Sequence, residues 1–212
     1  MRDFPMFTTE NGAASLIFRE VPYRGIAYIR IQSSESPEAL LKECCDFAVA
    51  VGAERIFATG HSFLEKYSFH TAIYSLTAEK NTIEPGSASL FPVTKDTLER
   101  FREIYNQKME AVPNSAYMTS DMAKEMLEKG QGYFVHDKGT LLGIGMIDGG
   151  EMKALASCRQ GGGVEVLRTL CNGIMEDTVT LECASVNKKA MALYRSAGFL
   201  VRKELSRWYR IK

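Results

Sequence analysis

The most regular pattern in this 212-residue chain is the stretch Leu181-Glu-Cys-Ala-Ser-Val-Asn187-Lys-Lys-Ala190-Met-Ala-Leu193-Tyr194-Arg-Ser-Ala-Gly198-Phe199. Its apolar beginning predicts a buried strand over residues 178–184. Asn187 suits the N-cap of a helix, because its side chain can accept a hydrogen bond from a first-turn amide. Gly198 is typical of a helix end, and residues 200–210 resume strand character. The stretch therefore predicts a strand, a capped helix and a strand in succession.

A glycine run precedes this stretch. Residues 152–158 are predicted to form a strand, and residues 164–174 a helix; the loop between them contains Gly161-Gly162-Gly163. The first amides of a helix lack intrahelical partners, and glycine lets an anion approach them closely. The loop therefore predicts a phosphate site, to which Arg159 would add positive charge. A plain turn without a ligand is the alternative.

The remaining residues predict further strands and helices. Strands are expected at 15–21, 25–32, 55–59 and 68–76, and then at 91–93, 132–136 and 141–148. Helices are expected at 36–52, 98–109 and 120–130. Residues 77–90 lose periodicity and include Pro85 and Gly86, which predicts a linker and a domain boundary near residue 88. This order of elements indicates a mixed α/β fold.

The stretch from Leu181 to Phe199 resembles the closing motif of the GNAT superfamily of acyl-CoA-dependent N-acetyltransferases. That motif is an apolar strand followed by Asn, by Ala three residues later, by Leu-Tyr and by Gly-Phe. The order of elements extends the resemblance over residues 91–212. It implies a GNAT-like central mixed sheet with flanking helices in a domain of residues 89–212. A smaller α/β domain of residues 1–88 would precede it, with the element order of a degenerate half repeat.

The resemblance also implies that acetyl-CoA is a co-substrate. In the family, the strand before the glycine loop holds the pantetheine arm through its backbone, and the loop and the following helix end bind the pyrophosphate. The corresponding residues here are Leu155, Ala156, Ser157 and Cys158 in the strand, and Arg159, Gln160, Gly161, Gly162, Gly163 and Val164 in the loop. Val164 stands where the family has a small residue. Asn187 would lie near the cofactor, although capping its helix accounts for it equally well.

Tyr194 occupies the place of the family's proton donor to the departing CoA thiolate. A phenol with a pKa of about 10 stays protonated at neutral pH and can supply that proton; a packing role in the core is the alternative. A general base is also needed, because an alkyl ammonium must lose a proton before it attacks a thioester. Glu151 and Glu182 are both candidates, and the sequence does not choose between them.

Composition excludes several other classes of protein. The chain has 26 basic and 26 acidic residues, so no charge excess points to nucleic acid. Its apolar runs are short, which predicts no membrane span, no signal peptide and a cytoplasmic location. Its five cysteines form no Cys-x-x-Cys pair, so they predict free thiols and no metal site.

The resemblance therefore implies an N-acetyltransferase that moves an acetyl or other short acyl group from acyl-CoA to a primary amine. The amine attacks directly in a ternary complex. The acceptor is a small-molecule or peptide amine that the sequence does not identify, and the oligomeric state stays open, with a homodimer as one option. The alternatives are a catalytically inactive protein that binds or senses acyl-CoA, and an interaction domain with the same fold.

Overall fold

A computed structural model describes residues 6–212 of the chain. Residues 1–5, on which the expectation of no signal peptide rests, lie outside this part. The described residues divide into two compact units. The first consists of residues 6–72 and Leu205–Lys212, and the second of Ile73–Glu204. No helix among the described residues is long and apolar enough to cross a membrane.

The first unit contains a small mixed sheet. Its strands are β1 (Met6–Thr9), β2 (Gly12–Ile17), β3 (Ile26–Ser33) and β4 (Arg55–Thr59), followed by the end of β11 (Leu200–Arg210). The strands are antiparallel except β3 and β4, which pair in parallel. Two helices, α1 (Val21–Arg24) and α2 (Pro37–Ala50), and the 3-10 turn Ser62–Lys66 complete the unit.

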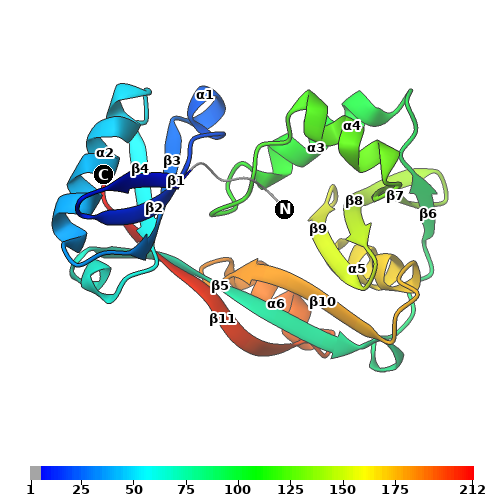
Figure 1. Cartoon of the computed structure of the whole chain (residues 1–212). Coiled ribbons are helices and arrows are strands. Elements are labelled where there is room, and N and C mark those ends of the chain that lie inside the picture. The colour runs from blue at the N-terminus through cyan, green and yellow to red at the C-terminus, as the bar shows by residue number, and fades with distance from the viewer. Residues whose placement is uncertain (1–5) are drawn as a thin grey trace. The chain divides into compact units, whose positions relative to one another are not determined.

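Helix α2 covers one face of this sheet (Figure 1). Pro37 opens the helix, where its missing amide hydrogen costs nothing. The apolar side of α2 includes the fully buried Leu40 and Cys44, which pack in one cluster with Ile29 of β3 and Ile56 of β4. The unit thus has the order strand, helix, parallel strand around its own core.

The second unit contains a larger mixed sheet in the order β11-β5-β10-β9-β8-β7-β6. Its remaining strands are β5 (Ser68–Glu79), β6 (Ser89–Pro92), β7 (Gly132–Asp137), β8 (Thr140–Asp148), β9 (Glu151–Ser157) and β10 (Thr178–Ala184). Its helices are α3 (Leu98–Met109), α4 (Ser120–Glu128), α5 (Gly163–Asn172) and α6 (Lys188–Ser196), and the 3-10 turn Lys80–Thr82 follows β5.

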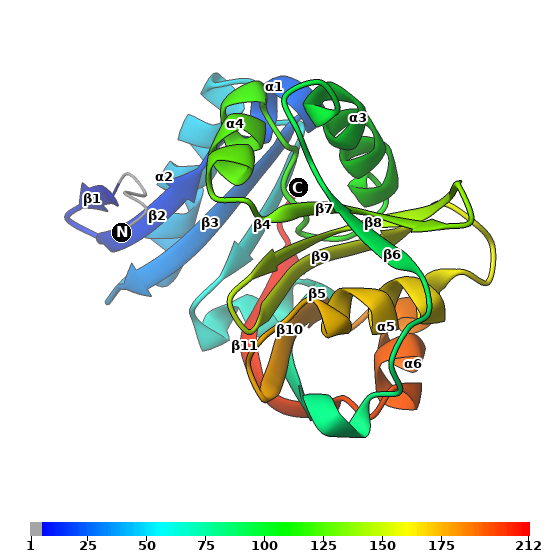
Figure 2. The ribbon, with the colours of Figure 1, turned by 90° about the vertical axis from the view of Figure 1, so that its right-hand side faces the viewer.

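Helices cover both faces of this second sheet (Figure 2). α5 and α6 pack on one face, in a core cluster that includes Leu167, Leu170 and Tyr194. α3 and α4 pack on the other face of β7, β8 and β9, in a separate cluster around Phe101. α5 lies very close to β8, since a Cβ atom added at Gly145 would stand 2.3 Å from a methyl of Leu170. A larger residue at this position would displace the Leu170 side chain.

The structure confirms the mixed α/β fold and most of the expected elements, and it differs from the prediction at several places. The strand expected at 15–21 ends at Ile17, and Val21 belongs to α1. The short elements β1 and α1 were not predicted. The boundary also differs from the expected residue 88, because the division falls between Ala72 and Ile73. β5 continues to Glu79 in antiparallel pairing with β10, and Gly86 lies against α5, so the aperiodic residues 77–90 are not a linker.

The five cysteines are free, and three of them are buried. Burial raises the pKa of Cys44 and Cys171 to about 12 and that of Cys183 to about 11, from an ordinary value of 9.0. In the unfolded chain these thiols ionise near the ordinary value. Their contribution to stability is therefore complete below that value and is lost as the pH rises toward the folded-state values, by about 1.4 kcal/mol per pH unit for each thiol.

We therefore expect the urea concentration at the unfolding midpoint to decrease as the pH is raised from about 8 to about 9.5, in the presence of reductant. This range lies below the ionisation of lysine and tyrosine. A Cys44→Ala variant, which lacks one of the three buried thiols, should show a shallower fall. Equal midpoints for the native chain at both pH values would contradict the expectation.

Candidate active site

The parallel strands β9 and β10 separate soon after they meet. Their register contains only two pairs, Thr180 with Glu151 and Leu181 with Met152, although β9 continues to Ser157 and β10 to Ala184 (Figure 1). Beyond these pairs β9 keeps its partner β8 but has no strand partner on the β10 side among residues 6–212. The two strands therefore splay apart toward their carboxyl ends, and a gap opens within the sheet.

A β-bulge at Lys153 accompanies this separation. The register of β9 with β8 passes from Met152 to Ala154, so Lys153 is the extra residue. A bulge bends its strand and reverses the side-chain alternation. Met152 accordingly belongs to the core cluster of α5, whereas Ala154, two residues later, packs with the cluster of α3.

The backbone groups of β9 point alternately toward β8 and toward the gap. The Cys158 amide donates to the Leu142 carbonyl of β8 at 2.8 Å. Hydrogen-bonded pairs alternate in an antiparallel ladder, so Ala156 also faces β8, while Leu155 and Ser157 direct their amide and carbonyl groups toward the gap. The resemblance implied that all four residues 155–158 bind the pantetheine arm. The structure instead makes only Leu155 and Ser157 available to a ligand through the backbone.

The glycine loop leads from β9 into the first turn of α5. Gly161 has a φ of 77°, a left-handed conformation that other residues rarely adopt. The first bond of the helix runs from the Val166 amide to the Gly162 carbonyl, so the amides of Gly163 and Val164 precede it, as at any helix start. Val164 is 39% exposed and is therefore not part of the core.

Ser157 shapes the entrance of this loop. Its hydroxyl donates to the Arg159 carbonyl at 2.6 Å and accepts from the Arg159 amide at 3.3 Å. Its side chain is therefore engaged locally, although its backbone faces the gap. Gln160 lies exposed between these residues and the glycines.

Helix α6 begins with a capping residue. Asn187 follows β10, and its side-chain oxygen accepts from the Ala190 amide at 3.2 Å, which confirms the predicted N-cap. A Cβ atom added at Gly163 would stand 3.3 Å from Leu193, so the start of α5 lies against the second half of α6. Because β9 and β10 run in parallel, both helix N-termini lie at the carboxyl edge of the sheet, where ligands of α/β sheets commonly bind.

Tyr194 is buried between β10 and α5 and packs against Phe199, with ring centroids 5.9 Å apart. Burial raises its pKa well above the ordinary value of 10.0, with a smaller contribution from the neighbouring Cys183 and Cys171 thiols. Its hydroxyl makes no hydrogen bond to the described residues, yet it is not among their fully enclosed unpartnered atoms. The phenol is therefore protonated at neutral pH, and its proton is not held by a described residue.

The two candidate bases occupy different parts of the strands. Glu151 begins β9 in its closed part, opposite Thr180, and forms an ion pair with Lys153. Glu182 stands one residue beyond the last β9–β10 pair, at the mouth of the gap. Its neighbours Leu181 and Cys183 face the core of α5 and α6, so Glu182 projects from the opposite face, where it is exposed.

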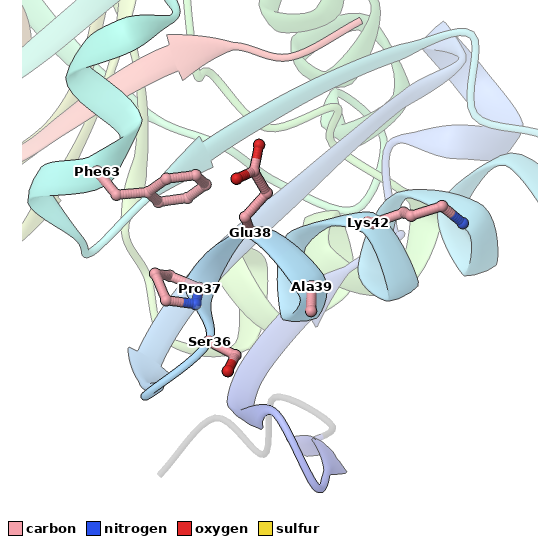
Figure 3. A pocket seen from close by; sticks show the side chains of 6 residues that line it. All are labelled: Ser36, Pro37, Glu38, Ala39, Lys42 and Phe63. Carbon is pink, nitrogen blue, oxygen red and sulfur yellow. The ribbon is translucent and has the colours of Figure 1, made fainter.

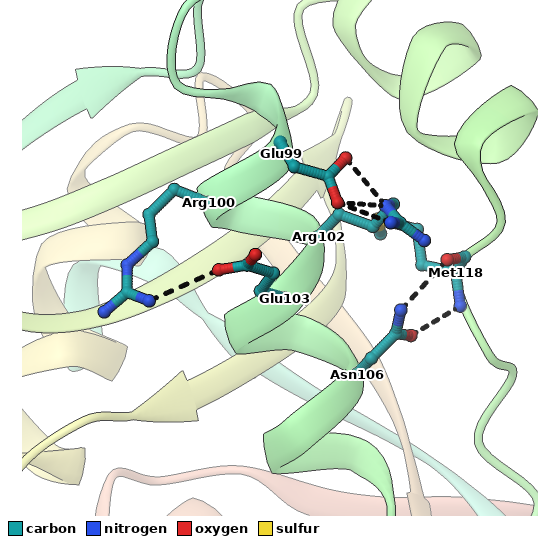
Figure 4. Close-up of polar contacts among 6 residues, drawn as sticks. All are labelled: Glu99, Arg100, Arg102, Glu103, Asn106 and Met118. Carbon is teal, nitrogen blue, oxygen red and sulfur yellow. Dashed lines mark hydrogen bonds and ion pairs between the residues drawn. The ribbon is translucent and has the colours of Figure 1, made fainter.

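On that opposite face, two hydrogen bonds join Asn106 of α3 to Met118, in the segment between α3 and α4 (Figure 4). The Asn106 side chain of α3 donates to the Met118 carbonyl at 3.0 Å and accepts from the Met118 amide at 2.7 Å. Met118 is buried in the same cluster as Ala156. Neighbouring ion pairs, Arg102 with Glu99 and Arg100 with Glu103, line the exposed side of α3.

The first unit repeats the order strand, helix, parallel strand without the gap. β3 and β4 stay paired over five consecutive positions, from Ile26 with Arg55 to Arg30 with Thr59. A pocket of about 530 Å³ lies at the start of α2, where Figure 3 shows the Glu38 carboxylate and the Phe63 ring. Glu38 is paired with Lys66 at 2.6 Å. The β3–β4 pairing thus lacks the separation that divides β9 from β10.

The geometry defines a class of protein: a mixed α/β fold with a splayed parallel strand pair and two helix N-termini at its open edge. No family model and no curated protein matches the sequence. Solved structures do match. A GCN5-related N-acetyltransferase from Sphaerobacter thermophilus has a TM-score of 0.62 at 12% identity, over 93% of this chain and 75% of that one.

Two further structures have the same architecture. One is a GCN5-related N-acetyltransferase from Kribbella flavida, with a TM-score of 0.59 at 13% identity, over 96% of this chain and 58% of that one. The other is a conserved protein of unknown function from Staphylococcus epidermidis, with a TM-score of 0.62 at 11% identity, over 98% and 93% of the two chains. The chain therefore has the GNAT fold, as the closing motif predicted.

Proposed function

We propose that this protein is an acyl-CoA-dependent N-acyltransferase that transfers an acetyl or other short acyl group to a primary amine. The observation that carries the proposal is the gap between β9 and β10, with the unpaired backbone groups of Leu155 and Ser157 along it. Unpaired strand groups favour an extended ligand with amide groups of its own, as in the pantetheine arm of CoA. The GNAT fold of the chain supports the same ligand.

The open edge of the gap suits the phosphates of that ligand. The first-turn amides of α5 carry the positive end of a helix dipole, and Arg159 adds a full charge at the loop. Gly161, Gly162 and Gly163 let the anion approach the backbone closely.

The reaction uses two proton transfers by residues of this chain. Glu182 accepts a proton from the acceptor ammonium, and the free amine then attacks the thioester carbonyl. A carbon–nitrogen bond forms, and the nitrogen of the tetrahedral adduct loses its second proton to solvent. The carbon–sulfur bond then breaks, and Tyr194 donates its phenolic proton to the departing thiolate. Solvent then reprotonates Tyr194. The acceptor is a small-molecule or peptide amine, which reaches the thioester from the face that Glu182 occupies.

A thermal unfolding assay with CoA and acetyl-CoA tests the site. A ligand that binds only the folded state stabilises it by about 2.7 kcal/mol at a hundredfold excess over its Kd, so the midpoint should rise. Arg159→Ala should weaken CoA binding about tenfold, the loss of one charge-assisted contact. Arg30→Ala, which removes an exposed arginine of β3 in the first unit, is the matched control and should leave the shift unchanged.

Failure of CoA and acetyl-CoA to move the midpoint of a well-folded sample would exclude the proposed site and favour an interaction domain. A shift without thiol release, across a panel of amines, would favour an acyl-CoA-binding protein without turnover. Thiol release in the presence of one amine identifies the acceptor.

A further inference from the structure

A five-residue strap, Glu84-Pro-Gly-Ser-Ala88, lies along α5 although it stands far away in the sequence. It approaches the helix so closely that a Cβ atom added at Gly86 would stand 2.5 Å from the Thr169 amide nitrogen. The Asn172 side chain donates to the Gly86 carbonyl at 2.9 Å. The strap is therefore packed on the helix backbone itself.

The strap meets the first turn of α5 through the carboxylate of Glu165. One oxygen, Oε1, accepts from the Ser87 amide at 2.6 Å, the Ala88 amide at 2.7 Å and the Ser87 hydroxyl at 3.1 Å. Thr169 of the same helix adds a bond to this oxygen at 3.3 Å. Two successive backbone amides thus form an anion-binding nest that the chain fills with its own carboxylate.

Glu165 stands next to Val164, within the turn whose amides face the proposed phosphate site. Burial alone would raise the pKa of Glu165, but the bonds from Ala88 and Ser87 outweigh it and hold the pKa below the ordinary value of 4.5. The carboxylate is therefore ionised at neutral pH. It is drawn toward the strap, which limits its repulsion of a phosphate at the helix start.

We infer that Glu165 is a positioning residue. Its hydrogen bonds to the strap fix the first turn of α5 in the orientation that binds the pyrophosphate of CoA. This inference rests on the proposed function. It assigns Glu165 no contact with the substrate, because its Oε1 is occupied by the strap. The residue acts through the amides of its own turn.

Two substitutions at Glu165 separate the effect of its hydrogen bonds to the strap from the effect of its charge. Glu165→Ala removes the acceptor oxygen, and we expect it to weaken CoA binding about tenfold, the effect of losing a hydrogen bond to a charged group. Glu165→Gln keeps an oxygen at Oε1 and removes only the charge, so its Kd for CoA should stay within about twofold of the native value. Calorimetric titration with CoA measures both.

Acetyl-pantetheine, which lacks the pyrophosphate, provides the second readout. Its affinity should be the same in the native protein and in both variants, since Glu165 acts at the phosphate end. Equal weakening of CoA and acetyl-pantetheine in Glu165→Ala would indicate a general structural defect and overturn the inference. Unchanged or tighter CoA binding in that variant would also overturn it, the tighter result indicating charge repulsion alone.

Gly86→Ala provides an independent disturbance if Glu165→Ala does not fold. Its added methyl would collide with Thr169 and lift the strap from α5 with Glu165 intact. It should weaken CoA and spare acetyl-pantetheine, and CoA affinity at the native level would overturn the inference. Glu84→Gln is the matched control, because it removes an exposed charge of the same strap, paired with Arg168 farther along α5, and should change neither Kd. A native protein that binds neither ligand overturns the proposed function as well.

Discussion

Replacing Tyr194 with phenylalanine is expected to lower kcat about 100-fold, the lower range of the contribution of a general acid. The phenol is protonated at neutral pH because burial raises its pKa, and its hydroxyl has no partner among the described residues. The substitution therefore removes a proton donor without breaking a bond of the fold. The Kd for acetyl-CoA should stay unchanged, since the ring is retained.

Stability distinguishes this role from simple packing. Removing a poorly satisfied hydroxyl from the interior should leave the thermal midpoint unchanged or slightly higher. Tyr133→Phe is the matched control, because Tyr133 of β7 packs against the same core cluster from a strand remote from the gap. Its kcat should remain near the native value. A Tyr194→Phe variant with native kcat would assign the tyrosine to packing alone.

The closing motif made the second half of the chain predictable. Residues 178–184 and 200–210 form strands with the predicted bounds, and Asn187 caps the helix between them. These elements combine strong apolar periodicity with a cap or a terminating glycine, so local chemistry and tertiary packing agree. β1 and α1 contain four residues each, too few to show a period.

The predicted domain boundary near residue 88 differs from the observed division, between Ala72 and Ile73, for another reason. Pro85 and Gly86 interrupt the periodicity, which usually marks a linker. Here Gly86 is needed because the strap lies directly against the backbone of α5. Composition alone does not distinguish a glycine that permits flexibility from one that permits close packing.

The gap itself could not be derived from the residues of β9. In a regular strand Met152 and Ala154 would face the same side of the sheet. The bulge at Lys153 places them in different core clusters and selects which backbone groups face the gap. The sequence signal was indirect, namely the glycine loop that follows the strand. Comparison with the unsplayed β3–β4 pair shows that the order strand, helix, strand does not by itself produce the opening.

The two candidate bases can be separated by matched substitutions. Glu182→Gln is expected to lower kcat about 100-fold at neutral pH, the lower range of a general-base contribution. Glu182 stands at the mouth of the gap and projects from the face opposite α5 and α6. Glu151→Gln should retain nearly native kcat, because Glu151 lies in the closed part of the strand pair and is engaged with Lys153. The two variants remove the same charge from neighbouring strands.

The pH dependence of the defect is the decisive measurement. An alkyl amine has a pKa of about 10, so an increasing fraction of the acceptor is already deprotonated as the pH rises. A residue that only removes this proton becomes dispensable in alkali. The ratio of native to Glu182→Gln kcat should therefore fall from about 100 at pH 7 toward about one near pH 10. A ratio that stays constant over this range would show that Glu182 does not act as the base, and a large defect in Glu151→Gln that disappears in alkali would transfer that role to Glu151.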